Sequence, residues 1–444
     1  MASGLKEKIA SRDAHVVVVG IGYVGLPLAV EVAGAGFNTV GYDLSKWKVE
    51  RLNAGEAYIK DVQTSVLAPL VQSGKLSGST DADVLAKADV VVICVPTPLN
   101  KTKDPDNSFI IAALDELVPR MHSDILVVLE STTFPGFTRE LMVPKLASQG
   151  FTVGENLFVA FSPERVDPGN AKFQTKNTPK VIGGMTPRCT EMIKALYGTF
   201  LDKLVPVSST DAAEMVKLLE NTFRAVNIGL VNEVAIMCKK LNLDTFEVID
   251  AAATKPFGFM PFYPGPGLGG HCIPIDPHYL SWKLKTLKYN ARFIELAGEV
   301  NSSMPEVVIE RVASALNDVE RSVKGAKVMV LGVAYKRDID DVRESPALDV
   351  IQLLRDRGAE VSYHDPYISS IRLGEDDHGN APVDAPRLAS VPFEKLDGYD
   401  AIVVVTDHSA LDYARLVREA RLVVDTRNAT KRVREGAKAR IVTL

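Results

Sequence analysis

A single cysteine in a glycine-rich loop is the residue of this chain best suited to covalent chemistry. The loop holds Cys272 and reads Gly265-Pro-Gly-Leu-Gly-Gly-His-Cys-Ile-Pro-Ile-Asp276. So many glycine and proline residues exclude a helix or a long strand and predict a sharply turned loop with little side-chain bulk. Such a loop could present the thiol to a substrate, with the carboxylate of Asp276 four residues further on. The alternative is a tight structural turn with an incidental cysteine, and the loop by itself supports both interpretations.

A second pair of polar residues is expected on a long helix before this loop. Apolar residues recur at three- and four-residue spacing over residues 212–241, which is the pattern of a helix. Lys217 and Asn221 are four residues apart, so both project from one face of that helix. A cation and an amide donor placed this way could stabilise a developing oxyanion. The alternative for both residues is a solvent-exposed helix face.

The length of the chain predicts several domains that position these residues. Its 444 residues exceed what one hydrophobic core usually holds. We expect an NAD-binding domain over residues 1–205, a central helical and dimerisation region with the cysteine loop over residues 206–322, and a second α/β domain over residues 323–444. The net charge of −5 gives no basic field that would favour nucleic acid or an anionic membrane as a partner.

Cysteine usage and apolar segments predict a cytoplasmic protein. The four cysteines are widely scattered, without a CxxC pair or ligand spacing, which argues against zinc and against a disulfide framework and fits a reducing compartment. The first fifteen residues are charged and lack the apolar core of an export signal. No apolar run approaches the roughly 20 residues needed to span a bilayer. We therefore expect no metal site and no membrane partner.

A dinucleotide-binding fingerprint stands near the amino terminus. Residues 15–19 read as a buried parallel strand, and a glycine run leads from them into a helical pattern. Gly20 allows the tight turn, Gly22 admits a pyrophosphate, and Gly25 lets helix and strand pack closely. About 20 positions later a second strand ends in an acid that can accept hydrogen bonds from ribose hydroxyls and would repel a 2′-phosphate. The predicted NAD-binding residues of this fingerprint are Gly20, Gly22, Tyr23, Val24, Gly25 and Asp43.

Three further strands are predicted to deliver polar residues to the ligand edge of the same sheet. The buried runs are residues 88–95, 125–130 and 157–161. Parallel strands would bring the residues that follow them, Thr97, Thr132 and Glu164, to one edge, with Thr97 near the expected nicotinamide position. For Thr132 and Glu164 the alternative is helix capping or turn chemistry.

The carboxyl-terminal part repeats the strand-and-helix pattern with a different ligand edge. Its predicted strands are residues 327–332, 360–366, 401–406 and 422–425. Only one glycine stands in the first turn, so the full dinucleotide fingerprint is missing. Lys336, Arg337 and Arg343 follow the first strand and Arg427 follows the last, and basic residues at this edge suit a diphosphate, although surface cations are common. Residues 373–391 are polar and are predicted to form a loop.

The predicted fold class is α/β, with two Rossmann-like doubly wound domains joined by a central long-helix region. Long amphipathic helices in such a region often carry a dimer interface, so we expect a homodimer or a higher homo-oligomer.

Hydride removal from an alcohol gives an aldehyde, and a thiolate that adds to it gives a thiohemiacetal. A second hydride removal gives a thioester, which water hydrolyses to an acid. A dehydrogenase that stops at the carbonyl would not need the thiol, so Cys272 favours a four-electron oxidation.

At this point the sequence resembles the UDP-glucose/GDP-mannose dehydrogenase family over nearly its whole length. The motifs that carry the resemblance stand in the family's order and spacing. They are Gly20-Ile-Gly-Tyr-Val-Gly25, Val95-Pro-Thr97-Pro, Glu130-Ser-Thr132, Ser162-Pro-Glu164, Glu214-Met-Val-Lys217-Leu-Leu-Glu-Asn221, Gly269-Gly-His-Cys272-Ile-Pro-Ile-Asp276 and Tyr335-Lys336 through Arg343-Glu-Ser. The resemblance implies NAD as cofactor and a UDP-sugar bound by residues 323–444.

The resemblance also implies catalytic roles. Cys272 would be the nucleophile, and Lys217 and Asn221 would stabilise the oxyanions of the thiohemiacetal and of thioester hydrolysis. Asp276 and Thr132 would hold the catalytic water and help proton transfer.

Further roles concern binding and hydrolysis. Glu164 would assist as a base in hydrolysis, and Arg343 would approach the NAD phosphates. The substrate-binding residues implied by the resemblance are Glu164, Lys217, Asn221, Tyr263, Gly269, His271, Lys336 and Arg427.

Three departures from the glucose enzymes favour the branch of the family that acts on UDP-N-acetylhexosamines. His271 precedes the cysteine where the glucose enzymes usually carry serine, Tyr263 stands where they carry a lysine, and Pro168 replaces a second acid. The loop sequence is most similar to enzymes that oxidise UDP-N-acetylglucosamine for bacterial surface polysaccharides. The N-acetylmannosamine and N-acetylgalactosamine enzymes remain alternatives, and UDP-glucose is a weaker one.

Two alternatives lie outside this reaction. A non-catalytic nucleotide-sugar sensor could keep the fold, but it would not need the nucleophile or Lys217, and both are present. A two-electron dehydrogenase of the 6-phosphogluconate type would share the first domain and the long helix, but it would not need a thiol on a glycine loop.

Overall fold

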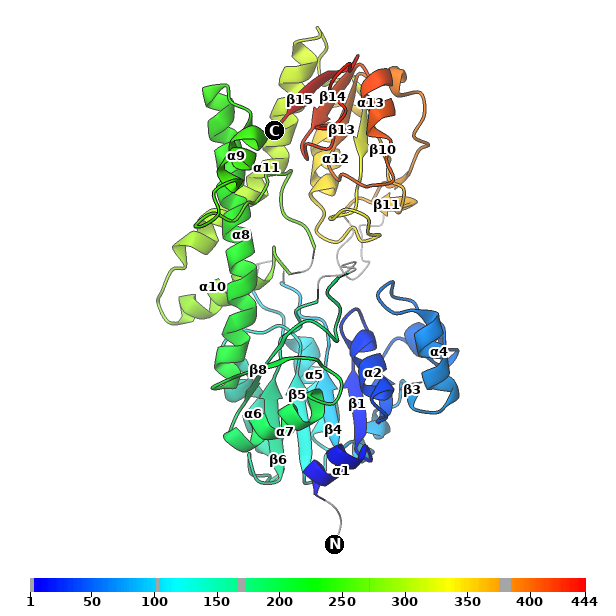
Figure 1. The fold of residues 1–444 in the computed structure, drawn as a ribbon, viewed down its shortest axis with the longest axis vertical. Helices are drawn as coiled ribbons and strands as arrows, with labels where there is room; N and C mark the ends of the chain where they lie inside the picture. Colours follow the sequence, from blue (N-terminus) through cyan, green and yellow to red (C-terminus); the bar gives the residue numbers. More distant parts are fainter. Residues whose placement is uncertain (1–3, 101–103, 167–171, 271, 375–384) are drawn as a thin grey trace. The chain divides into compact units, whose positions relative to one another are not determined.

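The computed structural model describes residues 4–100, 104–166, 172–270, 272–374 and 385–444. These residues form two compact units, each with its own sheet (Figure 1). Unit 1 consists of Met1–Glu220 with His278–Lys288, and unit 2 consists of Asn221–Pro277 with Tyr289–Leu444.

Unit 1 is built on an eight-stranded sheet in the order β3-β2-β1-β4-β5-β6-β7-β8. The strands are β1 His15–Val19, β2 Asn38–Tyr42, β3 Leu76–Ser79, β4 Val90–Ile93, β5 Ile125–Leu129, β6 Leu157–Phe161, β7 Lys180–Gly184 and β8 Leu204–Val207. All pairs are parallel except β6 with β7. The strand order reverses between β1 and β4, and ligands of such sheets bind at the carboxyl ends beside this reversal.

Short helices cover this sheet. They are α1 Leu5–Ser11, α2 Gly25–Gly34, α3 Lys46–Asn53, α4 Thr64–Gln72, the 3₁₀ helix η1 Ala82–Lys87, α5 Ser108–Leu117, the π-helical turn η2 Thr138–Met142, α6 Val143–Ala147 and α7 Pro187–Tyr197. Val16 and Val18 of β1 share one core cluster with Leu28 and Val32 of α2. This arrangement explains why β1 is apolar at nearly every position, because a parallel strand covered by helices is buried on both faces.

Four helices lie between the two sheets in the sequence. They are α8 Thr210–Leu241, α9 Thr245–Ala253, α10 Asp276–Thr286 and α11 Arg292–Asn317. In unit 2 α8 lies directly on α11, since a Cβ added to Gly229 would come within 3.1 Å of the Cα of Ala297. Buried Asn232 donates to the Oδ1 of Asn301 at 2.9 Å, and Asn301 donates to the carbonyl of Ala225 at 3.0 Å, so the polar groups between these helices are paired.

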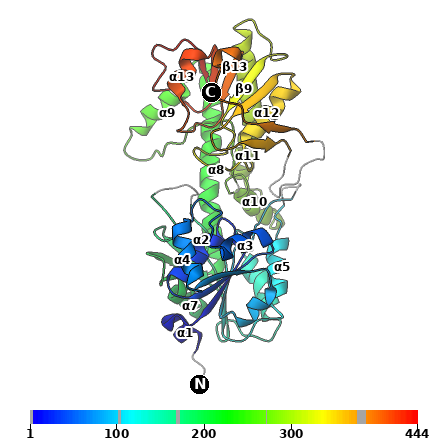
Figure 2. The same ribbon diagram turned by 90° about the vertical axis from the view of Figure 1, so that its right-hand side faces the viewer.

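Unit 2 contains a five-stranded parallel sheet in the order β10-β9-β13-β14-β15 and a separate antiparallel pair. The strands are β9 Lys327–Leu331, β10 Glu360–His364, β11 Ser370–Arg372, β12 Arg387–Ala389, β13 Ala401–Val404, β14 Leu422–Asp425 and β15 Arg440–Thr443. The helices that come after α11 in this unit are α12 Pro346–Asp356, η3 Leu396–Gly398 and α13 Tyr413–Glu419. Helices α11 and α12 contact each other and this sheet (Figure 2).

The residues of β9 show how this sheet is buried on both faces. Val328 and Val330 belong to one core cluster, and Met329 and Leu331 belong to the other. Alternate residues of a strand point to opposite faces, so each face of the sheet has its own core.

The predicted α/β fold with two doubly wound domains and a central helical region is confirmed. The short strands β3, β7, β8, β11 and β15 were not predicted from the sequence. Pro206 stands within β8, and a proline is tolerated there because an edge strand leaves one row of amides unpaired. The prediction of a loop over residues 373–391 was wrong for β12, although residues 375–384 lie outside the described part. No helix among the described residues is long and apolar enough to cross a membrane.

Candidate active site

The glycine turn after β1 has the geometry that a dinucleotide phosphate requires. Gly20 has φ +86°, and a Cβ there would lie 2.8 Å from the carbonyl oxygen of Cys94. A Cβ on Gly25 would lie 1.8 Å from the carbonyl oxygen of Gly20, so helix α2 can start this close to the strand only with glycine. Beside Gly22 there is open space within 4 Å. The residues present therefore fit the pyrophosphate of NAD at the start of α2.

Asp43 follows β2 at the same edge. Its carboxylate accepts hydrogen bonds from the main-chain amides of Ile21 at 3.0 Å and Ser45 at 2.8 Å, and Lys48 forms an ion pair with it at 3.0 Å. These contacts fix the carboxylate next to the glycine turn. Tyr23 is exposed and Val24 is partly buried on the same turn.

The loops after β4 and β5 are tied together. Ser131 Oγ donates to the carbonyl of Val95 at 2.8 Å, and the hydroxyl of Tyr279 on α10 donates to the carbonyl of Thr97 at 3.0 Å. Thr132 is partly buried between two buried neighbours. The buried Oγ1 of Thr133 has no hydrogen-bond partner among the described residues. A buried hydroxyl left unsatisfied by the protein beside the expected nicotinamide position is consistent with a ligand site.

Glu164, predicted as a base, is held in a buried ion-pair network. Its Oε2 lies 2.7 Å from Lys180 Nζ, and its Oε1 accepts from the amides of Arg165 and Val166 at 2.9 and 2.7 Å. The same ammonium contacts Glu130 at 2.6 Å. Burial raises the pKa of Glu164, but Lys180 and the amide hydrogen bonds outweigh it, and the net pKa is lowered. Glu164 is therefore ionised and accepts three hydrogen bonds in this arrangement.

Helix α8 carries Lys217 and a second buried acid, Glu214. The ammonium of Lys217 donates to the carbonyl oxygen of Glu164 at 2.7 Å. Glu214 accepts from the amide of Gly136 at 2.6 Å and from the amide and hydroxyl of Thr138 at 2.9 and 2.6 Å. Burial raises the pKa of Glu214 to about 7. These contacts join α8 to the segment that follows β6 and to the start of η2 within unit 1.

In unit 2 the cysteine loop leads into a buried polar pair. Cys272 is exposed, whereas the other three cysteines are buried. The main-chain amide of Asp276 donates to the carbonyl of Cys272 at 2.8 Å, so one turn separates thiol and carboxylate. Asn221 donates to the Oδ2 of Asp276 at 2.6 Å, and both side chains are buried. The structure thus brings together two of the predicted catalytic residues, Asn221 and Asp276.

The glycines of the loop make room for an aromatic ring. A Cβ on Gly269 would lie 2.7 Å from the Cβ of Tyr335, and one on Gly270, where φ is +82°, would lie 2.6 Å from the tyrosine ring. The amide of Gly270 donates to the carbonyl of Arg343 at 3.1 Å. The loop is therefore seated on the segment that follows β9.

A pocket of about 310 Å³ lies at the carboxyl edge of the second sheet. It is lined by Pro266, Gly267, Tyr335, Lys336, Arg337, Pro346, Val405, Thr406, Asp407 and Arg427. Two of the predicted substrate-binding residues, Lys336 and Arg427, are among them. Asp407 forms ion pairs with Arg337 and, at 3.5 Å, with Arg427. Clustered cations beside glycine loops suit an anionic ligand such as a diphosphate.

Other predicted residues lie elsewhere. The hydroxyl of Tyr263 donates to Asp250 at 2.8 Å, and Tyr263 is not among the described residues that line the pocket. Arg343 forms an ion pair with Asp341 at 2.7 Å. His271 lies outside the described residues.

Two charged residues of these sites, Lys180 and Asp407, were not predicted from the sequence. Lys180 opens the buried strand β7, and no spacing in the sequence links it to Glu130 and Glu164, 50 and 16 residues away. Asp407 had a usable signal, since the polar run from Thr406 follows the buried strand β13 at a ligand edge.

Family models agree with this division of sites. The chain matches three models of the UDP-glucose/GDP-mannose dehydrogenase family: the NAD binding domain at residues 14–201, the central domain at residues 211–303 and the UDP binding domain at residues 329–432.

Individual relatives are similar over most of their length. The UDP-N-acetyl-D-glucosamine 6-dehydrogenase of Pseudomonas aeruginosa is 34% identical over 403 residues, which cover 90% of this chain and 91% of that protein. A UDP-N-acetyl-D-mannosamine dehydrogenase of Methanococcus maripaludis is 34% identical and covers 88% and 86%. The solved UDP-D-ManNAc dehydrogenase of Pyrococcus horikoshii superposes with a TM-score of 0.85 at 32% identity, covering 96% of this chain and 99% of that one. The chain therefore belongs to the UDP-glucose/GDP-mannose dehydrogenase family and is an NAD-dependent UDP-sugar dehydrogenase.

Proposed function

We propose that this enzyme oxidises C6 of a UDP-N-acetylhexosamine, UDP-N-acetylglucosamine in particular, to the 6-carboxylate through a covalent intermediate on Cys272. The observation that carries the proposal is the thiol's position. Cys272 is exposed on a loop whose residues Pro266 and Gly267 line the cationic pocket of the same unit. The names of the similar proteins in Pseudomonas aeruginosa and Methanococcus maripaludis support an N-acetylated sugar.

The chain's own residues account for the covalent steps. The thiolate of Cys272 adds to the C6 aldehyde, and oxidation of the resulting thiohemiacetal gives a thioester. Lys217 and Asn221 stabilise the oxyanion of each tetrahedral species. Asp276 and Thr132 hold the water that hydrolyses the thioester, and Glu164 assists as the base. Bound NAD supplies a hydride acceptor for each of the two oxidations.

Binding is shared between the two nucleotide sites. Gly20, Gly22, Tyr23, Val24, Gly25, Asp43, Thr97, Thr132 and Arg343 hold NAD in this proposal. Lys336 and Arg427 neutralise the diphosphate of the sugar nucleotide, while Tyr263, Gly269 and His271 contribute to sugar recognition. The proposal includes three domains, at residues 1–205, 206–322 and 323–444, and a cytoplasmic location.

We also propose a homodimer through helix α8. Phe223, Leu230, Met237 and Leu241 recur at seven- and four-residue spacing and are each 46% to 68% exposed. This spacing puts them on one face of the helix. An exposed apolar stripe of this length favours association with a second copy, because it would otherwise leave a large apolar area in water.

A substrate screen tests the proposal. Formation of NADH is measured with UDP-N-acetylglucosamine, UDP-N-acetylmannosamine, UDP-N-acetylgalactosamine, UDP-glucose and GDP-mannose. We expect UDP-N-acetylglucosamine to give the highest kcat/KM. Preference for another hexosamine would overturn the choice of epimer, preference for UDP-glucose would overturn the N-acetyl specificity, and binding without NADH formation would leave a nucleotide-sugar sensor.

A further inference from the structure

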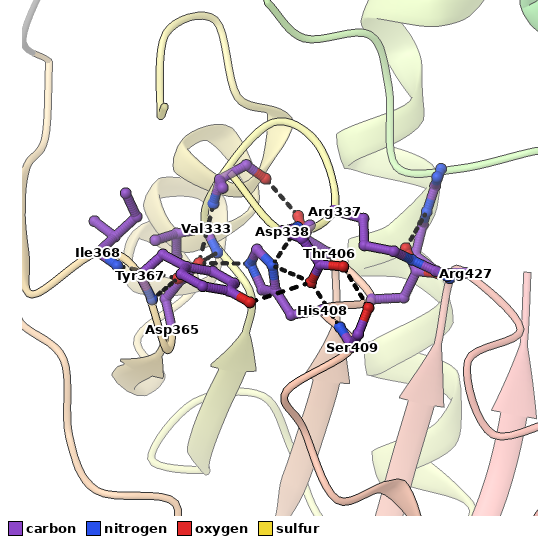
Figure 3. Close-up of polar contacts among 12 residues, drawn as sticks. Val333, Arg337, Asp338, Asp365, Tyr367, Ile368, Thr406, His408, Ser409 and Arg427 are labelled. Carbon is purple, nitrogen blue, oxygen red and sulfur yellow. Dashed lines mark hydrogen bonds and ion pairs between the residues drawn. The ribbon is translucent and has the colours of Figure 1, made fainter. Parts of the chain in front are cut away.

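A buried imidazole lies behind the cationic pocket. His408 is fully buried, follows β13 and comes directly after Asp407. Its Nδ1 accepts a hydrogen bond from the main-chain amide of Asp338 at 2.9 Å, and its Nε2 lies 3.0 Å from the Oδ2 of Asp365 (Figure 3). Because an amide can only donate, Nδ1 carries no proton, and Nε2–H donates to the carboxylate. The two hydrogen bonds thus fix the orientation of the His408 ring.

Asp365 holds the beginning of the segment that follows β9 and ends at Asp338. Its Oδ2 also accepts from the amides of Val333 at 2.7 Å and Ala334 at 3.1 Å, directly after β9. Burial raises the pKa of Asp365, but the hydrogen bond from His408 and those from main-chain amides outweigh it, so the net pKa is lowered. The carboxylate is ionised and works as a fixed acceptor.

The two pocket cations that follow β9 lie between these anchors. Lys336 and Arg337 stand after Ala334, which Asp365 holds, and before Asp338, which His408 holds. Asp338 has φ +63°, and its carboxylate accepts from the amide of Ser409 at 2.7 Å. Because both the amide and the carboxylate of this left-handed residue are hydrogen-bonded, the direction of the chain after Arg337 is fixed.

We propose that His408 is a positioning residue for the nucleotide diphosphate. The ring of His408 connects the carboxylate of Asp365, which holds the start of the Lys336–Arg337 segment, with the main-chain amide of Asp338 at the end of that segment. His408 thereby positions both cations at the pocket without touching the ligand. Preorganised cations bind a diphosphate more tightly because less conformational freedom is lost on binding. The inference rests on the proposed function in one respect, namely that this pocket takes a nucleoside diphosphate.

Two substitutions separate the two hydrogen bonds of the ring. His408→Gln can place an amide donor near the Nε2 position but removes the acceptor for the Asp338 amide. His408→Asn can place an oxygen near the Nδ1 position but does not reach Asp365. If the Asp338 anchor sets the cations, His408→Gln should weaken UDP binding by about five- to tenfold, the cost of one hydrogen bond. His408→Asn should weaken it by less.

The test is isothermal titration calorimetry of the full-length protein with UDP and, separately, with NAD. We expect unchanged NAD affinity in both variants and, in steady-state assays, a raised KM for the sugar nucleotide with little change in kcat. His364→Gln is the matched control, because this histidine lies on the same sheet but contacts the carbonyl of Val391 at 2.7 Å instead of the cationic segment. It should bind UDP like the wild type.

A double-mutant cycle shows whether His408 acts through Arg337. In an Arg337→Gln background the further effect of His408→Gln on UDP affinity should shrink, because the positioned cation is already gone. Wild-type protein that does not bind UDP would overturn the proposed function. Wild-type UDP binding with equal affinity in folded His408→Gln would overturn only the inference. So would an equal loss of UDP and NAD affinity, which indicates general destabilisation.

Discussion

At the scale of single residues, the buried ammonium of Lys180 decides the state of Glu164. It lies within 2.7 Å of both Glu130 and Glu164, and the hydroxyl of Tyr197 also donates to Glu130. Burial raises the pKa of Glu130, and the shared cation of Lys180 offsets the cost of placing the two carboxylates side by side. The hydrogen-bond partners of Glu164 fix the orientation of its carboxylate, but its lowered pKa means that it accepts a proton less readily than an unpaired carboxylate would.

Removal of this cation should be costly. Lys180→Met leaves Glu130 and Glu164 close together without the cation that they share, and we expect the free energy of unfolding to fall by about 3–5 kcal/mol. Chemical denaturation at neutral pH measures it. The double variant Lys180→Met/Glu130→Gln removes one carboxylate and should recover part of the loss. Equal stabilities for the single variant and the wild type would show that the network contributes nothing.

The glycine loop lies against the ring of Tyr335 at Gly270. Gly270→Ala would force a methyl group to 2.6 Å from the Tyr335 ring, whereas at Gly258, where φ is +70°, no atom lies within 4 Å of the added Cβ. Both substitutions carry the same backbone strain, so their difference isolates the clash, which we expect to cost about 1–3 kcal/mol. Thermal unfolding and kcat of both variants check this. A Gly258→Ala variant as impaired as Gly270→Ala would exclude the ring contact as the cause.

At the scale of elements, Glu214 connects α8 to the turn before η2. It offers four lone-pair directions to three donors from Gly136 and Thr138. Helix α8 carries Lys217 one turn further on, so this anchor also fixes where that ammonium lies in unit 1.

This anchor predicts a pH dependence of stability. The pKa of Glu214 is raised from 4.5 to about 7 by burial. Between these values the folded protein holds the proton and the unfolded chain has lost it. The contribution of Glu214 to the free energy of unfolding is therefore complete below about pH 4.5. It falls as the pH rises through 7, by a total on the order of 3 kcal/mol.

Urea unfolding of wild type and Glu214→Gln at pH 5 and pH 8 measures this contribution. The amide does not titrate, so the stability difference between the two proteins should be larger at pH 5 than at pH 8. A difference that does not change with pH would mean that Glu214 keeps an ordinary pKa.

At the scale of the whole molecule, each sheet has a similar glycine turn after its first strand, although one sheet lies in the NAD binding domain of the family and the other in its UDP binding domain. Gly20 and Gly332 both have positive φ, and an added Cβ would meet the carbonyl oxygen of Cys94 or Thr406. After the second strand of each sheet, Asp43 or Asp365 accepts amide hydrogen bonds from that turn. Asp365 is fully engaged by His408 and main-chain amides, so its carboxylate is not available to a ribose as that of Asp43 is expected to be.

The stripe on α8 predicts the state of assembly. Replacing Leu230 and Met237 with glutamate puts charges into the proposed interface and should turn a dimer into a monomer in light scattering coupled to gel filtration. Lys239→Glu, on another side of the helix, should stay dimeric. A monomeric wild type, or a dimer that survives the double substitution, would refute the interface.

The long, periodic and buried segments could be predicted from the sequence, and the short ones could not. Strand β1 and helix α8 were clear because burial leaves an apolar period along the chain. Strand β3 reads Leu-Ser-Gly-Ser and has one apolar residue, so its pairing with β2 decides its conformation. Site residues that stand within sequence motifs could be predicted. The partners of Lys180, His408 and Asp407 could not, because they come from distant segments that only folding brings together.

The proposed reaction is a four-electron oxidation through Cys272. The most direct measurement is the number of NADH formed per UDP-N-acetylglucosamine consumed, with the product identified by mass spectrometry, in the wild type and in Cys272→Ser. We predict two NADH and a 6-carboxylate from the wild type, and a fall in acid formation of at least about a thousandfold in the serine variant, because an alcohol is a far weaker nucleophile than a thiolate. One NADH with an aldehyde product from the wild type, or normal acid production by Cys272→Ser, would refute the covalent four-electron mechanism.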